Sequence, residues 1–275
     1  MEGAVPRYPL VMGVLNVTPD SFFDGGRYAS YRSAVEHGQR LFADGADIVD
    51  VGGESSRPGA APVEEAEELR RVVPVIEALA PLGPISVDTA KPAVARAAVG
   101  AGASLVNDVS GTLFEVAAEG GAGWVAMHRK GTAADMQRHP HYDDVVGEVH
   151  TRLLELAGQA ERAGVTELWL DPGIGFGKTI QHNLALLAHL RDLVEVAEAR
   201  GARVLVGTSN KWFLGMLASG GPEAAPGPER AEGSIASIAW AMSRGVHMVR
   251  VHDVGSTVQA ARLAGRVAVA LEGVR

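Results

Sequence analysis

The chain contains no cysteine among its 275 residues. This absence excludes a disulfide framework and thiolate metal sites, and it permits a reducing compartment. No apolar run reaches the length of about 18 residues that a membrane span needs, so we expect no transmembrane helix. Glycine is abundant instead, with 34 residues, which indicates many tight turns.

An excess of positive charge is also missing. The formal net charge of -8 argues against a nucleic-acid surface, which usually carries a basic excess. Residues 1–9 lack a basic region followed by an apolar one, so we expect no signal peptide and a cytoplasmic location. A composition of 47% hydrophobic and 21% charged residues without any break fits one globular domain over residues 1–275.

The chain does contain a repeated pattern. Six times a helix-forming stretch ends in glycine, a short apolar run follows, and the run ends in polar residues. Glycine at a helix end supplies the left-handed backbone cheaply, and short apolar runs between turn signals indicate buried strands. These six strands begin at Ile48, Leu105, Trp124, Leu168, Val204 and Met248. Two more strands are expected at residues 10–17 and 84–88.

Helices are expected between these strands. They cover residues 31–44, 63–79, 92–101, 113–119, 143–163, 181–200, 229–244 and 257–271, with a Gly-Pro-rich surface loop at 220–228. Alternation of strands and helices favours parallel pairing with right-handed crossovers. Eight units in this length predict an α/β fold of the closed (β/α)8 TIM-barrel type, with a doubly wound open sheet as the alternative.

Polar side chains follow most of the predicted strands. In barrels of this type the active site lies at the carboxyl ends of the strands. Each polar residue there has an alternative explanation as a helix cap. Capping explains less well why several charged and amide side chains share one mouth, because buried polar groups need partners. These strand-end residues are Asn16, Asp50, Asp88, Asn107, Asp108, Met127, His128, Asp171, Ser209, Arg250 and His252.

The chemistry of this set points to two kinds of ligand group. Asp88, Asn107 and Asp171 can accept and donate along the edge of a planar nitrogen heterocycle. Arg250 and His252 alternate on one strand and suit a phosphate or carboxylate. The Gly-rich run 171–178 is a weaker signal for an anion, because its backbone N–H groups could face one.

Other features are read as structural. No HExxH or similar cluster indicates a tight metal site, and no nucleophile elbow surrounds the serines. Trp124 and Trp169 lie within strands and are expected to pack in the core. His139 and His141 flank a proline and are expected in a loop.

Five segments, in order and across nearly the whole chain, resemble the signatures of dihydropteroate synthases. The first two are long and specific. The segments are Met12–Gly26, Asp50–Gly59, Ile85–Thr89 with Leu105–Gly111, Leu170–Lys178 and Arg250–Asp253, and the stretch Met127–Thr132 is similar too.

The resemblance implies roles for particular residues. The pterin would be held by Asp88, Asn107, Met127, Asp171, Gly207 and Lys211. The pyrophosphate would contact Asn16, Arg57, Arg250 and His252, with Mg²⁺ as cofactor contacted by Asn16. The aminobenzoate pocket would include Ser56, Arg57, Pro58, Phe176, Lys211 and Trp212.

The resemblance also implies the reaction: condensation of 6-hydroxymethyl-7,8-dihydropterin pyrophosphate with para-aminobenzoate to give 7,8-dihydropteroate and pyrophosphate. The C–O bond to pyrophosphate would break early, and Asp88, Lys211 and Arg250 would stabilise the charges that develop. Asp24 or the departing pyrophosphate would take the proton from the arylamine. Sulfonamides are expected inhibitors, and the family is commonly a homodimer.

One segment departs from the family pattern. After the seventh strand the chain reads Ser209-Asn210-Lys211-Trp212, where the family usually has Arg in place of Asn210 and a small or polar residue in place of Trp212. Either these side chains point away from the site or the second-substrate pocket is altered. The alternatives are therefore a pterin-binding paralogue with altered or lost arylamine use, and a barrel related to methyltetrahydrofolate-binding methyltransferases. Asn16 and the pair Arg250 and His252 weigh against the latter.

Overall fold

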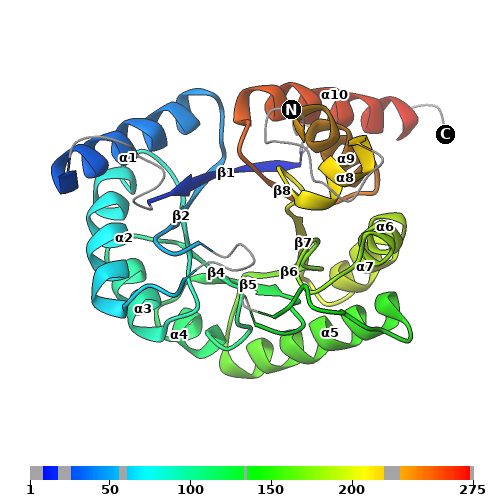
Figure 1. Ribbon diagram of the computed structural model, residues 1–275, viewed down its shortest axis with the longest axis horizontal. Helices are drawn as coiled ribbons and strands as arrows, with labels where there is room; N and C mark the ends of the chain where they lie inside the picture. Colours follow the sequence, from blue (N-terminus) through cyan, green and yellow to red (C-terminus); the bar gives the residue numbers. More distant parts are fainter. Residues whose placement is uncertain (1–8, 18–25, 56–60, 133–134, 220–229, 273–275) are drawn as a thin grey trace, which may run out of the picture.

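Eight parallel strands close into a barrel in chain order, each paired with the next and β8 with β1 (Figure 1). The computed structural model describes residues 9–17, 26–55, 61–132, 135–219 and 230–272. The strands are β1 (Leu10–Asn16), β2 (Ile48–Gly52), β3 (Ile85–Asp88), β4 (Leu105–Asp108), β5 (Gly123–Met127), β6 (Leu168–Asp171), β7 (Arg203–Val206) and β8 (Met248–Val251). The predicted TIM barrel is confirmed, and the open doubly wound sheet is wrong.

Helices surround the barrel as an outer ring (Figure 1). They are α1 (Gly26–Ala43), α2 (Glu65–Leu79), α3 (Pro92–Gly100), α4 (Phe114–Glu119), α5 (Val145–Ala163), α6 (Ile180–Ala188), α7 (Leu190–Glu198), α8 (Trp212–Ser219), α9 (Ala231–Ser243) and α10 (Val254–Glu272). Among the described helices, none is long and apolar enough to cross a membrane.

One helix prediction was wrong, and one helix was missed. The single helix expected over residues 181–200 is interrupted at His189, whose φ of -99° and ψ of 19° leave the helical range. Its ring Nδ1 lies 2.7 Å from Asp192 Oδ2, and buried Leu187 and Leu190 pack both halves onto the barrel. Helix α8 was not predicted, because its run of apolar residues around Gly215 gives no amphipathic period. The expected 220–228 loop lies outside the described residues.

The repeated glycine pattern is confirmed by the backbone. All six glycines of the pattern have positive φ, as the left-handed end of each helix requires. Helix α5 shows the complete arrangement: Asp144 accepts hydrogen bonds from Val146 N and Gly147 N at its start, and Gly164 ends it at φ 92°. The six glycines are Gly45, Gly102, Gly121, Gly164, Gly201 and Gly245.

The core has two parts. The larger lies between barrel and helices and includes Trp124, whose ring packs edge-on against Phe114 with centroids 5.6 Å apart. The smaller, which we call the barrel plug, consists of Met12, Ile48, Leu105, Val125, Trp169, Leu205 and Met248. Both tryptophans are therefore core residues, as predicted. Each large apolar side chain buried this way stabilises the fold by about 1.5–3 kcal/mol.

Candidate active site

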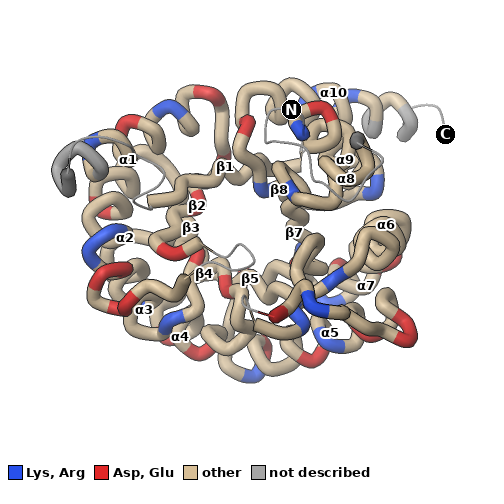
Figure 2. Tube along the Cα trace, in the orientation of Figure 1, with Lys and Arg blue, Asp and Glu red and all other residues tan. Residues whose placement is uncertain are grey.

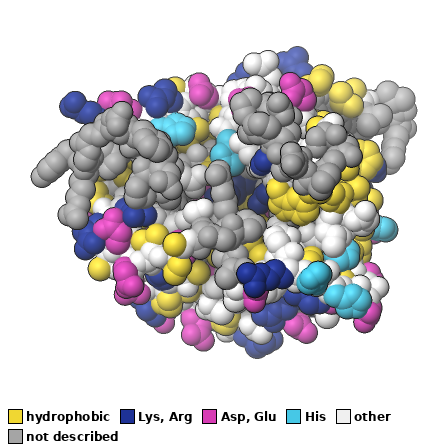
Figure 3. All heavy atoms as spheres, in the orientation of Figure 1, with side chains coloured by type: hydrophobic (Ala, Val, Ile, Leu, Met, Phe, Trp, Pro, Cys, Tyr) yellow, Lys and Arg dark blue, Asp and Glu magenta, His cyan; other side chains and the backbone are white. Residues whose placement is uncertain are grey.

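The carboxyl ends of the strands bring the predicted polar residues to one mouth. Strand register places Gly52 beside Asp88 and Asp88 beside Asn107, so the ends of β2, β3 and β4 are level. Acidic residues follow the β2–β4 side of the ring, and basic residues lie on the β7–β8 side (Figure 2). In the space-filling view, Lys and Arg side chains are visible in the hollow centre of this face (Figure 3).

Arg250 on β8 joins two carboxylates across the barrel. Its Nε donates to Asp50 Oδ2 at 2.6 Å, and its Nη2 donates to Asp88 Oδ2 at 2.7 Å. Asn107 Nδ2 also donates to Asp50 Oδ2, at 3.1 Å. The Asp50 carboxylate has no exposed surface and therefore acts from behind the pocket, where it fixes the guanidinium and the amide.

Burial perturbs the ionisation of the two carboxylates that face the pocket. Desolvation, assisted by the charge of Asp50, raises the pKa of Asp88 to about 7, although Arg250 opposes this shift. Desolvation likewise raises the pKa of Asp171 to about 6. Burial opposes ionisation of Arg250, but Asp50 and Asp88 raise its pKa above the ordinary value. A cationic guanidinium therefore stands beside carboxylates whose charge is costly, as is common at functional sites.

The Gly-rich turn after β6 is held by its own hydrogen bonds. Gly173 N donates to Asp171 Oδ1 at 2.7 Å, Gly175 N donates to Asn183 Oδ1 at 2.8 Å, and Phe176 N donates to Gly173 O at 3.1 Å. These three amides are bonded within the protein, so they are not available to an anion. The turn instead orients Asp171 and carries Phe176 to the pocket.

Lys178 stabilises this turn by hydrogen bonds to its backbone carbonyl groups. It is fully buried, and its Nζ donates to Gly173 O at 2.9 Å and to Phe176 O at 3.0 Å. The Nζ also lies 3.0 Å from His128 Nδ1. Burial, together with the charge of Lys178, lowers the pKa of His128 to about 3, so the ring is neutral near neutral pH. We did not predict this role, because its partners come from two different loops.

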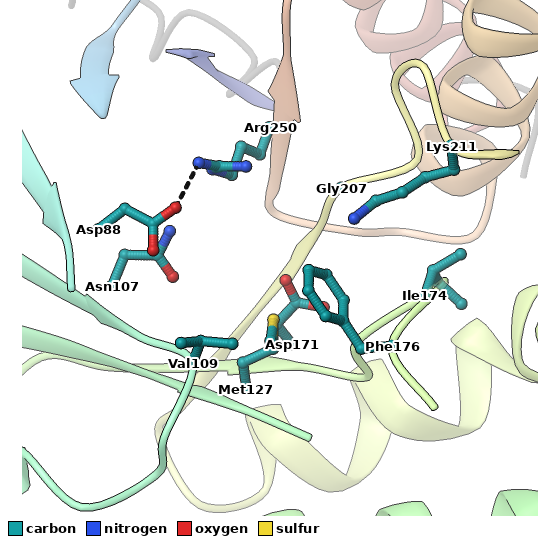
Figure 4. A pocket seen from close by; sticks show the side chains of 10 residues that line it. All are labelled: Asp88, Asn107, Val109, Met127, Asp171, Ile174, Phe176, Gly207, Lys211 and Arg250. Atoms are coloured by element: carbon teal, nitrogen blue, oxygen red, sulfur yellow. Dashed lines mark hydrogen bonds and ion pairs between the residues drawn. The ribbon is translucent and has the colours of Figure 1, made fainter. Parts of the chain in front are cut away.

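These residues enclose a pocket of about 370 Å³. Figure 4 shows Asp88, Asn107 and Arg250 on one side, with Lys211 reaching in from the other. The Nζ of Lys211 lies 4.0 Å from the centre of the Phe176 ring. The lining residues are Asp88, Asn107, Val109, Met127, Asp171, Ile174, Phe176, Gly207, Lys211 and Arg250.

The structure thus brings together all six residues expected around a pterin, and Phe176. Two lining residues, Val109 and Ile174, were not predicted, although each follows a strand-end acid within a quoted motif. Asp50 was noted only as a strand-end residue, and its position behind Arg250 could not be inferred from spacing.

The other expected residues lie around this pocket. Asn16 is at the end of β1 and lies close to Gly52. A Cβ added to Gly52 would lie 3.8 Å from Asn16 Oδ1. His252 lines an adjoining cavity, and its Nδ1 is 3.0 Å from Ser209 Oγ. Trp212 packs against the outer core instead of lining the pocket. Asp24, Ser56, Arg57 and Pro58 lie outside the described residues.

Asn210 has a backbone reason for being asparagine. Its φ is 58°, in the left-handed region that asparagine tolerates better than most residues. Its N donates to Ser234 Oγ at 3.0 Å, and its O accepts from Arg230 Nη1 at 3.1 Å. The departure from the family pattern therefore fits a turn held against α9, beside the pocket-lining Lys211.

A preformed metal cage is absent from the described part of the chain. No group of three His, Asp or Glu residues there is placed to hold an ion.

Comparison with known proteins agrees with this geometry. The model of the family "Pterin binding enzyme" matches residues 12–252. The chain belongs to this family. It is 44% identical to dihydropteroate synthase of Escherichia coli strain K12, covering 98% of this chain and 95% of the relative. It is 47% identical to the synthase of Mycobacterium leprae, covering 93% and 92%.

Solved structures give the same result. The Xanthomonas albilineans dihydropteroate synthase with 4-aminobenzoic acid aligns with a TM-score of 0.86 at 46% identity, covering 95% of this chain and 93% of that one. The Yersinia pestis synthase with a sulfonamide drug aligns with a TM-score of 0.86 at 40% identity, covering 97% and 96%.

Proposed function

We propose that this chain is a dihydropteroate synthase, which joins 6-hydroxymethyl-7,8-dihydropterin pyrophosphate to para-aminobenzoate with loss of pyrophosphate. The observation that carries the proposal is the pocket itself. One buried and one partly buried carboxylate, an amide and two cationic side chains converge there above an apolar surface that includes Met127 and Val109. The synthase from Xanthomonas albilineans has been solved with 7,8-dihydropteroate, the product of this reaction.

Recognition of the pterin follows from the hydrogen-bonding groups. A pterin presents ring N–H and amino donors along one edge, and carboxylate oxygens of Asp171 accept them. Asn107 offers both a donor and an acceptor to the same ring system, and its orientation is fixed by Asp50. Met127 lies on the floor of the pocket, where a thioether packs well on a flat ring.

Charge stabilisation accounts for the chemistry. When the C–O bond to pyrophosphate breaks, the electron pair leaves with the pyrophosphate and the pterin becomes cationic. We propose that ionised Asp88, which lines the pocket, stabilises that cation, and that Arg250 and Lys211 supply positive charge for the anionic partners. The neutral arylamine then forms the new C–N bond, and its proton passes to pyrophosphate or to Asp24.

Mg²⁺ fits this site as a companion of the pyrophosphate. Asn16 offers one amide oxygen at the mouth near Gly52, and Mg²⁺ usually combines few protein oxygens with phosphate oxygens and water. When bound there it supplies positive charge to the leaving pyrophosphate. His252 and Arg57 complete the proposed pyrophosphate contacts.

The second substrate is proposed to lie outward of the pterin. Phe176 and Lys211 form the described part of that pocket, with the ammonium held over the ring. Ser56, Arg57 and Pro58 are the remaining proposed contacts of that pocket. Sulfonamides mimic aminobenzoate in shape, and we propose them as inhibitors of this protein. We further propose a cytoplasmic homodimer, on the basis of the family resemblance.

A decisive assay is pyrophosphate release by the purified protein with the pterin substrate and Mg²⁺, with and without para-aminobenzoate. Release that depends on the arylamine and yields dihydropteroate is expected. Tight pterin binding without product would instead identify a paralogue that has lost arylamine use. An Asp24→Asn variant with unchanged turnover would leave pyrophosphate as the proton acceptor.

A further inference from the structure

A serine hydroxyl and a histidine ring meet where the loops after β7 and β8 begin. Ser209 Oγ lies 3.0 Å from His252 Nδ1 and accepts a hydrogen bond from His252 N at 3.2 Å. Only 8% of Ser209 is exposed. Within the described part of the chain, its hydroxyl oxygen has no hydrogen-bond partner other than His252. The side-chain contacts of Ser209 therefore all serve this histidine.

The neighbouring backbone fixes where the Ser209 hydroxyl lies. On one side, Thr208 Oγ1 accepts a hydrogen bond from Ser237 Oγ of α9 at 2.8 Å. On the other side, Asn210 N donates to Ser234 Oγ of the same helix at 3.0 Å. Both neighbours of Ser209 are thus bonded to α9, so the position of its hydroxyl does not depend on a ligand.

The backbone of His252 is also held, but its ring has room to turn. Asp253, the next residue, accepts hydrogen bonds at the start of α10, from Ser256 N to its Oδ1 at 3.1 Å and from Thr257 Oγ1 to its O at 2.6 Å. Ser209 and His252 both line a cavity of about 300 Å³. The bond to Ser209 therefore restrains a ring that has open space beside it.

The hydrogen bonds of Ser209 also decide which ring nitrogen carries the proton of the neutral imidazole. A hydroxyl donates one hydrogen and accepts through its lone pairs. Ser209 Oγ already accepts from His252 N, and His252 Nδ1 is the acceptor within reach of its own hydrogen. A proton on Nδ1 would leave that buried hydroxyl hydrogen without an acceptor, which is costly. The neutral ring is therefore protonated on Nε2.

We infer that Ser209 is a positioning residue for the pyrophosphate, because it holds His252 in the tautomer whose Nε2–H donates to an anionic oxygen. This inference rests on the proposed function, in which His252 contacts the pyrophosphate. An Nε2–H group attracts phosphate oxygens, whereas the Nε2 lone pair of the other tautomer repels them. Ser209 is not among the described residues that line the proposed pterin pocket, so removal of its hydroxyl is expected to act on the pyrophosphate alone.

Nitrogen NMR of the histidine rings tests the tautomer without turnover. The chain has nine histidines, and the signals of His252 are assigned by their loss in His252→Gln. In alkaline buffer, where histidine rings are neutral, the wild type is expected to be protonated on Nε2 and not on Nδ1. Ser209→Ala should give a mixture of both tautomers, and Ser209→Thr, which keeps the hydroxyl, should resemble the wild type. A proton on Nδ1 in the wild type would overturn the inference.

Two pterin ligands separate an effect on the pyrophosphate from an effect on the ring. For Ser209→Ala the KM for 6-hydroxymethyl-7,8-dihydropterin pyrophosphate with Mg²⁺ is expected to rise about tenfold. The dissociation constant of 6-hydroxymethyl-7,8-dihydropterin, measured by calorimetry, should change by less than about twofold. Ser237→Ala is the matched control, because it removes a nearby hydroxyl that bonds to Thr208 instead of His252. It should match the wild type in both measurements.

The remaining outcomes also decide the matter. Equal losses for the two ligands would mean that Ser209 supports the whole pocket, and an unchanged tautomer with unchanged KM would mean that it does not position the ring; either result overturns the inference. If Ser209→Ala does not fold, Ser209→Cys, whose thiol is a weak donor, takes its place under the same criteria. If the wild type makes no dihydropteroate, the proposed function fails. The ring spectra and the calorimetric affinity for pyrophosphate with Mg²⁺ then still decide whether Ser209 positions His252 for an anion.

Discussion

Replacement of Lys178 by methionine is expected to change how the stability of this protein depends on pH. The lysine is fully buried behind the Gly-rich turn, where its Nζ reaches Gly173 O, Phe176 O and His128 Nδ1. Methionine has similar length and removes both the charge and the hydrogen bonds. Each buried acceptor left without a donor costs about 1–3 kcal/mol, so the variant is expected to be less stable above neutral pH.

The pH dependence has a definite sign. Burial lowers the pKa of Lys178 to about 7, whereas lysine in an unfolded chain titrates near about 10.4. Between these values the unfolded chain binds one more proton than the folded one. The penalty for burying the ammonium is therefore fully present below the folded pKa and is relieved as pH rises. The free energy of unfolding then gains about 1.4 kcal/mol per pH unit, which integrates to about 2 kcal/mol from pH 7 to pH 9.

Urea unfolding of wild type and variant at pH 7, 8 and 9 measures this difference. The gap between the two free energies of unfolding is expected to widen by about 2 kcal/mol over that range. Arg191→Met serves as control, because Arg191 is exposed and pairs with Glu195 on the surface of α7. Parallel curves for wild type and Lys178→Met would refute the reasoning, because they would mean that no buried ammonium loses its proton.

Three further outcomes are expected. Burial raises the pKa of Asp88 to about 7, and only its ionised form stabilises a cation, so kcat/KM for the pterin substrate should rise as pH increases through about 7. Asp88→Asn should abolish this rise and lower the rate about 100-fold. In Gly173→Ala the new Cβ would lie 1.8 Å from His128 O, at a φ of 66°. Calorimetry should therefore show weakened pterin binding, and the free energy of unfolding should fall by about 3 kcal/mol or more. Gly164→Ala should lose only about 1 kcal/mol of stability, because its Cβ meets nothing within 4 Å. Asn210→Gly should unfold in urea like the wild type, whereas the free energy of unfolding of Asn210→Ala should be about 1 kcal/mol lower. Equal urea midpoints for the two variants would mean that the φ of 58° carries no strain.

The barrel could be predicted because its signal is local. A left-handed glycine, an apolar run and a polar end recur six times along the chain, and each element of that pattern can be recognised within about ten residues. The break at His189 could not be predicted in the same way, because it depends on which leucines of α6 and α7 face the barrel. The pocket side chains followed from the barrel rule once the strand ends were known.

The roles of Asp50 and Lys178, which hold pocket residues in place, could not be predicted from the sequence. Asp50 acts through Arg250, which is 200 positions away, and Lys178 acts through His128, which is 50 positions away. Such pairs are set by barrel closure and loop packing, and no periodicity encodes them. The proposed contacts Asp24, Ser56, Arg57 and Pro58 stay predictions, since they lie outside the described residues.

The barrel plug has a consequence for how this protein can evolve. Its seven apolar residues come from seven of the eight strands and lie below the level of the pocket, so much of the stability is stored away from the ligands. Substitutions at the mouth can therefore change which arylamine or drug binds, while the stability contributed by the barrel plug is unchanged. Under selection by a new inhibitor, residues at the mouth of the barrel can therefore be substituted. Substitutions in the barrel plug are constrained first by the stability of the fold.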